Sequence, residues 1–140
     1  MLHPDFPVVE DEYKLTETWA VTLPGKFNRR FEDGDLIIWR PGLTIYVVIW
    51  NNDENESIAD RMAAIKEEMS PDAFAIEEKN DGDILRFGYR LNEDRGEEIV
   101  HAWYGFAFAP DGHVQAAIYF DEESDVEVAR QIWLSFSQAA

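Results

Sequence analysis

The side chains that could do chemistry in this chain are first of all its three histidines, His3, His101 and His113. His101 and His113 flank a predicted hairpin whose loop we take as 110–112, which places Ala109 opposite His113. In that register the two rings lie near opposite ends of adjoining strands, because each residue adds about 3.3 Å to a strand. The two rings are then too far apart to share a metal ion. We therefore expect neither a metal site nor a catalytic histidine.

Carboxylates are abundant, but their positions favour structural roles. Those in 33–35, 81–83 and 121–123 lie in turns or just before a helix, where acidic residues favour the helix dipole. The segment 53–56 resembles the start of an oxygen-rich cation loop, but it lacks the later Gly and Glu that an EF-hand requires. The chain has no Gly-x-Ser-x-Gly elbow and no glycine-rich phosphate loop. We expect no cofactor, and we favour a non-catalytic protein over an enzyme.

The first third of the chain predicts four strands. Alternating side chains indicate one strand over 16–23, which Pro24-Gly25 ends, and a second, short one over 27–31. The runs 36–40 and 43–50 are the most strand-like. Because both are apolar on both faces, we expect them to be central strands joined by a tight turn.

The rest of the chain predicts two helices separated by strands. Ser57 is an N-cap with Asp60 three residues on, and the helix that follows stops before Pro71. The last helix has Ser124 and Glu127 at the same capping spacing, followed by an apolar stripe. Between the helices, a meander of four strands is predicted over 74–78, 84–91, 98–109 and 113–120.

The strands come in hairpins and do not alternate with helices, which favours an α+β fold. We expect a mostly antiparallel sheet of about six to seven strands with two main helices packed on it as a sandwich. The length predicts a single domain over 1–140, in which 1–12 form a flexible or edge N-terminal arm.

Two short motifs resemble a known group of folds. One is Leu23-Pro24-Gly25-Lys26-Phe27 after the first strand, a Leu-Pro-x-x-Phe pattern, and the other is the Ile-x-x-Ser-Phe ending within 129–136. Together with the order of elements over 13–138, they look like the PsbP-like group, which includes the DcrB-like bacterial proteins and the Mog-type Ran-binding proteins. The resemblance implies a binding or assembly factor without enzymatic activity, and it carries no functional residue across.

One hairpin offers a candidate surface. With the loop at 110–112, Trp103 lies across from Tyr119, beside His101 and Gln115, on the face opposite the core. Either a helix covers this face, or it is a shallow aromatic groove for a ligand or a partner. The same two alternatives apply to Trp39, Tyr46 and Trp50.

Charge limits the possible partners. The formal net charge is -17, which repels the phosphate backbone of nucleic acids and anionic membrane surfaces. From Glu97 onward there are eight acidic residues and one basic residue, Arg130. This imbalance favours either a solvated face or a docking surface for a basic protein. The chain has no Cys, and its first residues lack the pattern of a signal peptide, so we expect a cytoplasmic protein.

These observations lead to three functional hypotheses. The first is a non-catalytic protein-binding module whose acidic surface docks a basic partner, as a bacterial immunity protein or a secretion chaperone would. The second is a small-molecule-binding protein or enzyme with a pocket near Trp103 and Tyr119. The third is a homodimer that uses the open sheet face as its interface.

Overall fold

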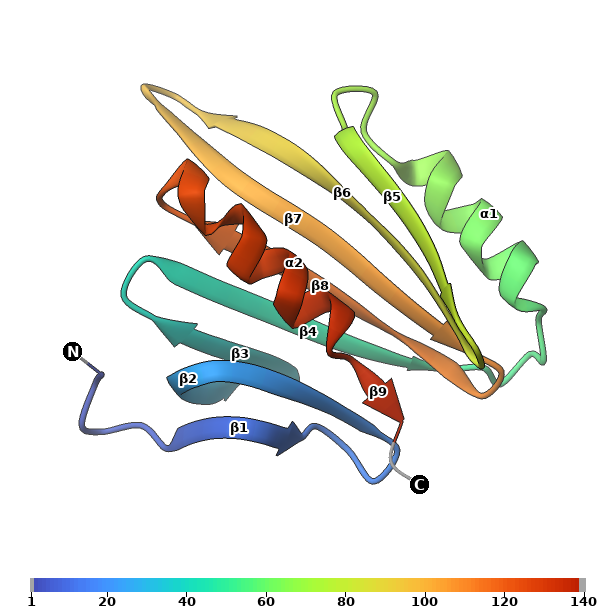
Figure 1. The fold of residues 1–140 in the computed structure, drawn as a ribbon, viewed down its shortest axis with the longest axis horizontal. Coiled ribbons are helices and arrows are strands. Elements are labelled where there is room, and N and C mark those ends of the chain that lie inside the picture. Colours follow the sequence, from blue (N-terminus) through green and yellow to red (C-terminus); the bar gives the residue numbers. More distant parts are fainter. Residues whose placement is uncertain (1, 139–140) are drawn as a thin grey trace.

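The computed structural model describes residues 2–138, which contain nine strands and two α-helices (Figure 1). The strands are β1 (Val8–Lys14), β2 (Trp19–Glu32), β3 (Asp35–Arg40), β4 (Leu43–Asn51), β5 (Phe74–Asp81), β6 (Ile84–Arg95), β7 (Glu98–Ala109), β8 (Gly112–Phe120) and β9 (Ser137–Gln138). The helices are α1 (Ile58–Glu68) and α2 (Val126–Leu134), which a short 3₁₀ turn (Glu123–Asp125) precedes. Neither helix is long and apolar enough to cross a membrane.

All the strands belong to one antiparallel sheet in the order β1-β2-β3-β4-β8-β7-β6-β5, with β9 added beside β2. The chain first runs from β1 to β4 through tight turns. Helix α1 then carries it to the far edge, and the meander β5 to β8 returns to pair β8 with β4. As a result β4 and β8, which are far apart in the sequence, become neighbours at the centre of the sheet.

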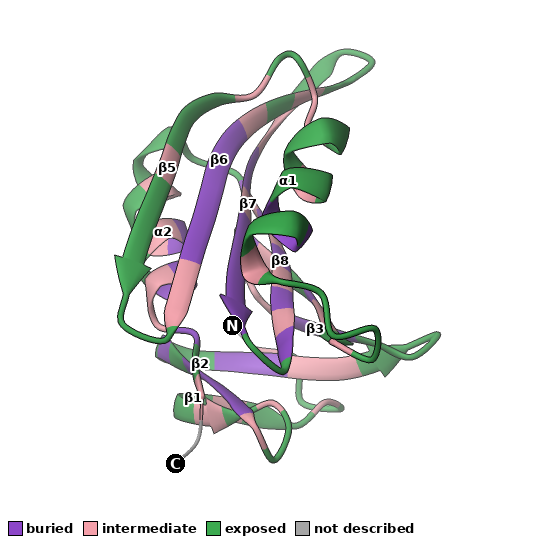
Figure 2. Cartoon of the chain, turned by 90° about the vertical axis from the view of Figure 1, so that its right-hand side faces the viewer, coloured by how far each residue is buried: buried purple, intermediate pink, exposed green. Residues whose placement is uncertain are grey.

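Strand β2 is one long strand, where the sequence predicted two short ones. Pro24-Gly25 does not end it, because Gly25 takes a φ of 118° and the chain bends there and continues. Strand β1 pairs with β2 on both sides of the bend, whereas β9 pairs only before it and β3 only after it. The bend therefore lets the sheet curl, so that β1 and β2 close over the face on which α2 lies (Figure 2).

The main core fills the space between α2 and the curled sheet. It joins the buried face of the sheet to the apolar side of α2, and the chain segment after α2 seals it with Phe136. Trp19, Trp103 and Trp133 are among its largest fully buried side chains. Burying this many large apolar side chains is the main stabilising contribution to the fold.

A second, smaller core lies on the opposite face, where α1 covers β6 and β7. Met62 from α1 packs against the aromatic rings of Phe87, Tyr89 and Phe106. The helix begins where the sequence predicted, since the Ser57 hydroxyl accepts a hydrogen bond from the Asp60 backbone N–H at 3.0 Å. The two helices thus lie on opposite faces, and each covers only part of its face.

The expected α+β sandwich of six to seven strands with two main helices is wrong. The described residues form a largely β structure of nine strands, and its helices are only eleven and nine residues long. The extra strands come from segments that carry little strand signal, the acidic β1 and the two-residue β9. Ser124 does not cap α2 as predicted, because the N-cap is Asp125, which makes no capping hydrogen bond through its side chain.

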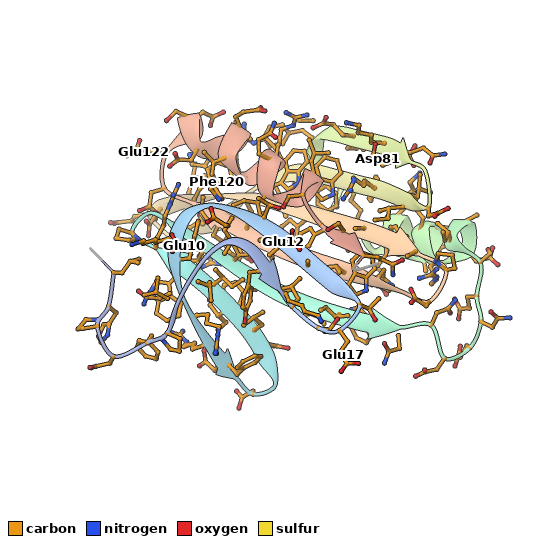
Figure 3. The ribbon with its side chains drawn as sticks, turned by 60° about the horizontal axis from the view of Figure 1, so that its bottom comes forward. Glu10, Glu12, Glu17, Asp81, Phe120 and Glu122 are labelled. Atoms are coloured by element: carbon orange, nitrogen blue, oxygen red, sulfur yellow. The ribbon has the colours of Figure 1, made fainter. Side chains whose placement is uncertain are left out.

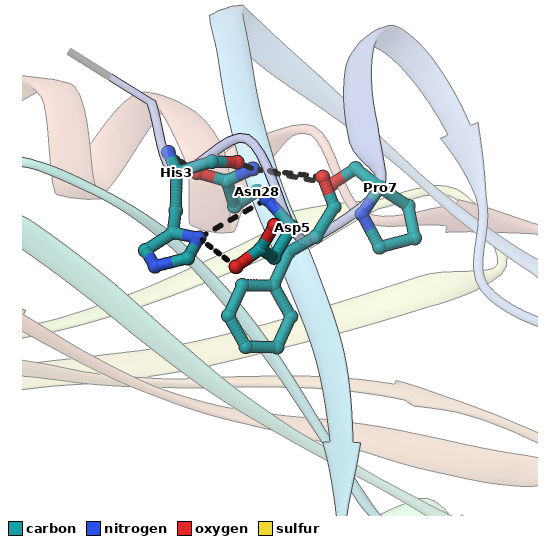
Figure 4. Close-up of polar contacts among 5 residues, drawn as sticks. His3, Asp5, Pro7 and Asn28 are labelled. Atoms are coloured by element: carbon teal, nitrogen blue, oxygen red, sulfur yellow. Dashed lines mark hydrogen bonds and ion pairs between the residues drawn. The ribbon is translucent and has the colours of Figure 1, made fainter.

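The N-terminal segment, predicted as a flexible or edge arm over 1–12, contributes the edge strand β1. In front of this strand, the buried side chain of Asn28 holds residues 3–6. Asn28 is fully buried; its amide nitrogen donates to the carbonyls of His3 and Phe6, and its oxygen accepts from the His3 N–H at 2.7 Å (Figure 4). Phe6 meanwhile packs edge-on against Trp39 at 5.1 Å. Asn28 therefore fixes this segment through main-chain atoms.

Candidate partner-binding surface

The hairpin of β7 and β8 sets which side chains face which way, and its register differs by one residue from the predicted one. The turn has two residues, Pro110 and Asp111, so that Ala109 pairs with Gly112 and Trp103 pairs with Ile118. Gly112 lies under the Trp50 carbonyl, where an added Cβ would be closer than 3.0 Å, so only glycine fits. A shift of one residue exchanges the two faces of β8. Trp103 and Tyr119, predicted to lie across from each other, are thus on opposite faces.

Trp103 is covered by a helix, one of the two outcomes that the sequence left open. Its side chain is fully buried and its ring centroid lies 5.2 Å from that of Trp133 on α2. Gly88 and Gly105 make room for these two indoles, because a Cβ at either position would approach an indole more closely than 3.0 Å. Trp103 is therefore a core residue.

His101 lies on the same face as Trp103, at the end of the core. Its ring stacks on Phe120 with a centroid distance of 5.6 Å, and its Nδ1 lies 3.1 Å from the Asn92 amide oxygen. The nearby Glu123 carboxylate accepts hydrogen bonds from the Arg90 guanidinium, which lowers the pKa of Glu123. His101 thus belongs to a polar network that ties the segment before α2 to the sheet.

Tyr119 and Gln115 lie on the other face, which α1 covers only in part. Burial alternates along β8, so that every second residue from His113 to Tyr119 is partly exposed (Figure 2). On the neighbouring strand β4, Tyr46 is 40% exposed and Trp50 is 52% exposed. We call this surface the β4–β8 face; its residues are Tyr46, Val48 and Trp50 from β4 and Gln115, Ala117 and Tyr119 from β8.

A tyrosine cluster occupies one end of the β4–β8 face. The Tyr104 hydroxyl donates to the Glu93 carboxylate and lies 3.0 Å from the Tyr119 hydroxyl, while the Arg95 guanidinium stacks over the Tyr119 ring. Tyr46 packs edge-on against Tyr119 at 5.8 Å. Burial raises the pKa of Tyr104 and of Tyr119, so both phenols stay protonated near neutral pH. Each therefore keeps a hydroxyl proton for hydrogen bonding.

Three cavities follow β8 along this face. The first, of about 360 Å³, lies between Trp50, His113 and Ile65, and the second, of about 160 Å³, lies between Ile65 and Gln115. The third, of about 340 Å³, lies at the tyrosine cluster and is lined by Thr44, Tyr46, Arg95, Val100, Ala117 and Tyr119. Every second residue of β8 from His113 to Tyr119 thus lines one of these cavities.

The first cavity has an aromatic wall and an acidic rim. The Trp50 indole is held in a stacked arrangement with the His113 ring at 6.2 Å. Burial, together with the nearby Arg61 charge, lowers the pKa of His113 to about 4, so this ring is neutral at pH 7. The rim carboxylates belong to Asp53, Glu54 and Glu56.

The loop that carries these carboxylates is held by Asn52. Its amide nitrogen donates to the carbonyls of Glu56 and Pro110, and its amide oxygen accepts from the Glu56 N–H at 2.9 Å. The neighbouring Glu54 carboxylate raises the pKa of Glu56, because it accepts a hydrogen bond from protonated Glu56 and because like charges crowd this rim. Arg61, the basic residue that lines the cavity, is buried and donates to the Ala109 carbonyl.

Of the four residues predicted to form one surface, the structure brings Tyr119 and Gln115 together and places Trp103 and His101 on the opposite face. Glu93 and Arg95 were missed because they lie in 92–96, a polar stretch after the predicted strand 84–91 that reads as a loop, yet β6 extends to Arg95 and brings both to the tyrosine cluster. Within residues 2–138, no group of three or more His, Asp or Glu side chains is placed to hold a metal ion.

No protein-family model and no curated protein matches this chain. The resemblance of its two short motifs to the PsbP-like group gains no support from that comparison.

Proposed function

We propose that this protein is a non-catalytic protein-binding module that docks a basic protein partner on the β4–β8 face. The observation that carries the proposal is the burial of the central strands β4 and β8, which differs between their two sides. On one side β4 and β8 are buried in the main core, and on the other they present Tyr46, Trp50 and Tyr119 to solvent. Central strands that are apolar on both sides are ordinarily covered on both sides.

The exposed side chains are of the kinds that concentrate binding energy. Tyr and Trp bury a large area at an interface and still satisfy a polar tip, and they are enriched among the residues that dominate affinity. Exposed aromatic groups gathered on one face favour an interaction site over a solvated surface.

A basic partner is supported by the charge of the molecule. The excess of acidic residues is spread over the surface, as Glu10, Glu12, Glu17 and Glu122 illustrate (Figure 3). Many of the basic side chains are already paired with carboxylates, namely Arg30, Lys66, Arg86, Arg90, Arg95 and Arg130. The remaining field attracts a cationic protein and speeds its association at low salt.

The small-molecule alternative now concerns the cavity at Tyr119 alone, since Trp103 lies across the sheet. That cavity has the volume of a small ligand site, and Tyr119 and Arg95 could orient a polar ligand there. Roles like those of an immunity protein or a secretion chaperone, in the cytoplasm, are specific forms of the main proposal.

A capture experiment with matched variants tests the proposal. The full chain, a Tyr46→Ser/Trp50→Ser double variant and an Ile99→Ser control are immobilised and exposed to lysate of the source cells. Ile99 is 64% exposed but lies away from the β4–β8 face. We expect one basic protein, identified by mass spectrometry, to be retained by the native chain and by the control. It should be lost from the double variant and released at about 0.5 M salt.

Equal capture by the double variant would overturn the proposal. A second copy of this chain on the face would also contradict it, and light scattering would show that outcome as a dimer that the double variant does not form.

A further inference from the structure

Building on the proposed function, we infer that the partner presents an extended segment of about seven residues, which lies along β8 and places a Lys or Arg side chain in the cavity beside Trp50. The three cavities lie in a row along one strand, and their two ends differ in charge. An extended segment with a basic end fits both features.

The spacing of the cavities matches an extended chain. His113 lines the first cavity, Gln115 lines the second, and Ala117 and Tyr119 both line the third. Ile65 lies between the first cavity and the second and lines both. From His113 to Tyr119 is six residues along a strand, or about 20 Å. An extended segment of seven residues spans the same length and turns every second side chain toward the sheet.

The end at Trp50 is suited to a cationic side chain. An ammonium or guanidinium group is attracted to an indole ring, and the Trp50 indole is half exposed and fixed by its stacking on His113. The carboxylates of Asp53, Glu54 and Glu56 surround the same cavity. A cation placed between them would relieve the crowding of like charges that Glu54 and Glu56 show in the free protein.

One cation, Arg61, already lines this cavity, and its charge acts on Glu56. The Arg61 guanidinium is buried, donates to the Ala109 carbonyl and lies over the Phe108 ring. The neutral His113 ring adds no positive charge at pH 7. The single charge of Arg61 does not balance the carboxylates of Asp53, Glu54 and Glu56, so the rim stays acidic toward an incoming side chain.

The end at Tyr119 suits an uncharged side chain, so the basic and the uncharged side chains lie at opposite ends of the segment. Arg95 lies over the Tyr119 ring there and is paired with Glu93, so this end has no excess negative charge to attract a cation. The ring faces of Tyr46 and Tyr119, together with Val100 and Ala117, offer apolar contact. We expect a tyrosine or another aromatic residue of the partner to occupy this cavity.

Two synthetic peptides of opposite order provide the probes, Ac-Lys-Ser-Ala-Ser-Ala-Ser-Tyr-amide and Ac-Tyr-Ser-Ala-Ser-Ala-Ser-Lys-amide. The matched control peptides carry norleucine in place of Lys. Binding to the full chain is measured by tryptophan fluorescence and by calorimetry. We expect at least one of the two orders to bind, and its norleucine analogue to bind at least tenfold more weakly.

Protein variants assign the effect to the cavity. A Glu54→Gln/Glu56→Gln double variant should weaken the Lys peptide about tenfold and leave the norleucine peptide unchanged. Glu67→Gln, an exposed position on α1 that lines none of the three cavities, should change neither. Trp50→Ala should remove both the fluorescence change and the preference for Lys.

Three outcomes would overturn the inference: equal binding of the Lys and norleucine peptides, no effect of the Glu54→Gln/Glu56→Gln variant, or no binding of either Lys peptide. If the Tyr46→Ser/Trp50→Ser variant still loses the captured protein, these outcomes leave the docking proposal standing, and only the mode of recognition fails.

Discussion

At the scale of single residues, His113 shows how the surroundings of a side chain decide its chemistry. The sequence marked it as a histidine at a strand end, and the structure places it between the Trp50 and Phe108 rings. Burial there lowers its pKa from 6.5 to about 4. It is therefore an aromatic packing residue at neutral pH, which no local pattern could have indicated.

This pKa shift makes stability depend on pH in a definite direction. As the pH falls below 6.5, the unfolded chain binds a proton at His113 before the folded chain does, so unfolding becomes easier down to about pH 4. After allowance for solvent screening, we expect His113 to account for about 1 to 2 kcal/mol of lost unfolding free energy over that range.

The replacement His113→Phe keeps an aromatic ring in place and removes the titration. Urea denaturation of both proteins at several pH values from 4 to 7 isolates the effect, because shared carboxylate contributions cancel in the difference. Parallel curves for the two proteins would show that His113 titrates as it does in the unfolded chain.

At the scale of elements, small residues determine how α2 docks on the sheet. An added Cβ at Gly105 would come closer than 3.0 Å to the Trp133 indole, whose Nε1 donates to the Phe106 carbonyl at 3.1 Å. We expect Gly105→Ala to lower the unfolding free energy by about 1 to 3 kcal/mol through overpacking, measured by chemical denaturation.

A double-mutant cycle tests the cause. In a Trp133→Phe background the smaller ring leaves room for the methyl group, so Gly105→Ala should cost less there than in the native chain. The same cost in both backgrounds would trace the effect to the β7 backbone and not to the contact with α2.

The sequence was sufficient for the local elements and insufficient for the way they join. Alternation located the meander, and Ser57 marked the start of α1 correctly. The bend at Pro24-Gly25 was read as a strand end because local signals do not show that β1 pairs with β2 on both sides of it. Likewise, choosing between a three-residue and a two-residue loop at Pro110 needed the contact between Gly112 and Trp50.

This one-residue difference in the pairing of β7 with β8 explains why the predicted surface grouped residues from opposite faces. The sequence identified aromatic residues worth testing, among them Tyr46, Trp50 and Tyr119, but it could not assign them to the same side of the sheet. Trp103 was grouped with Tyr119 because the longer loop reverses the faces of β8. The correct grouping depends on pairing between β4 and β8, which are far apart in sequence.

At the scale of the whole molecule, the curled sheet separates stability from binding. The inner face closes around α2 and holds the large tryptophans, while the outer face is shared between α1 and the exposed β4–β8 face (Figure 2). Edge strand β5 carries a bulge, and both edge strands carry acidic side chains, features that discourage pairing with further strands. Docking on the β4–β8 face is therefore favoured over extension of the sheet at either edge.

The most direct test of docking on the β4–β8 face is the set of tryptophan indole N–H signals in a nitrogen-15 NMR spectrum, recorded while the captured basic partner is added. We predict that the Trp50 signal shifts or broadens and that those of the buried Trp19, Trp103 and Trp133 stay in place. An unchanged Trp50 signal at saturating partner would contradict the assignment of binding to this face.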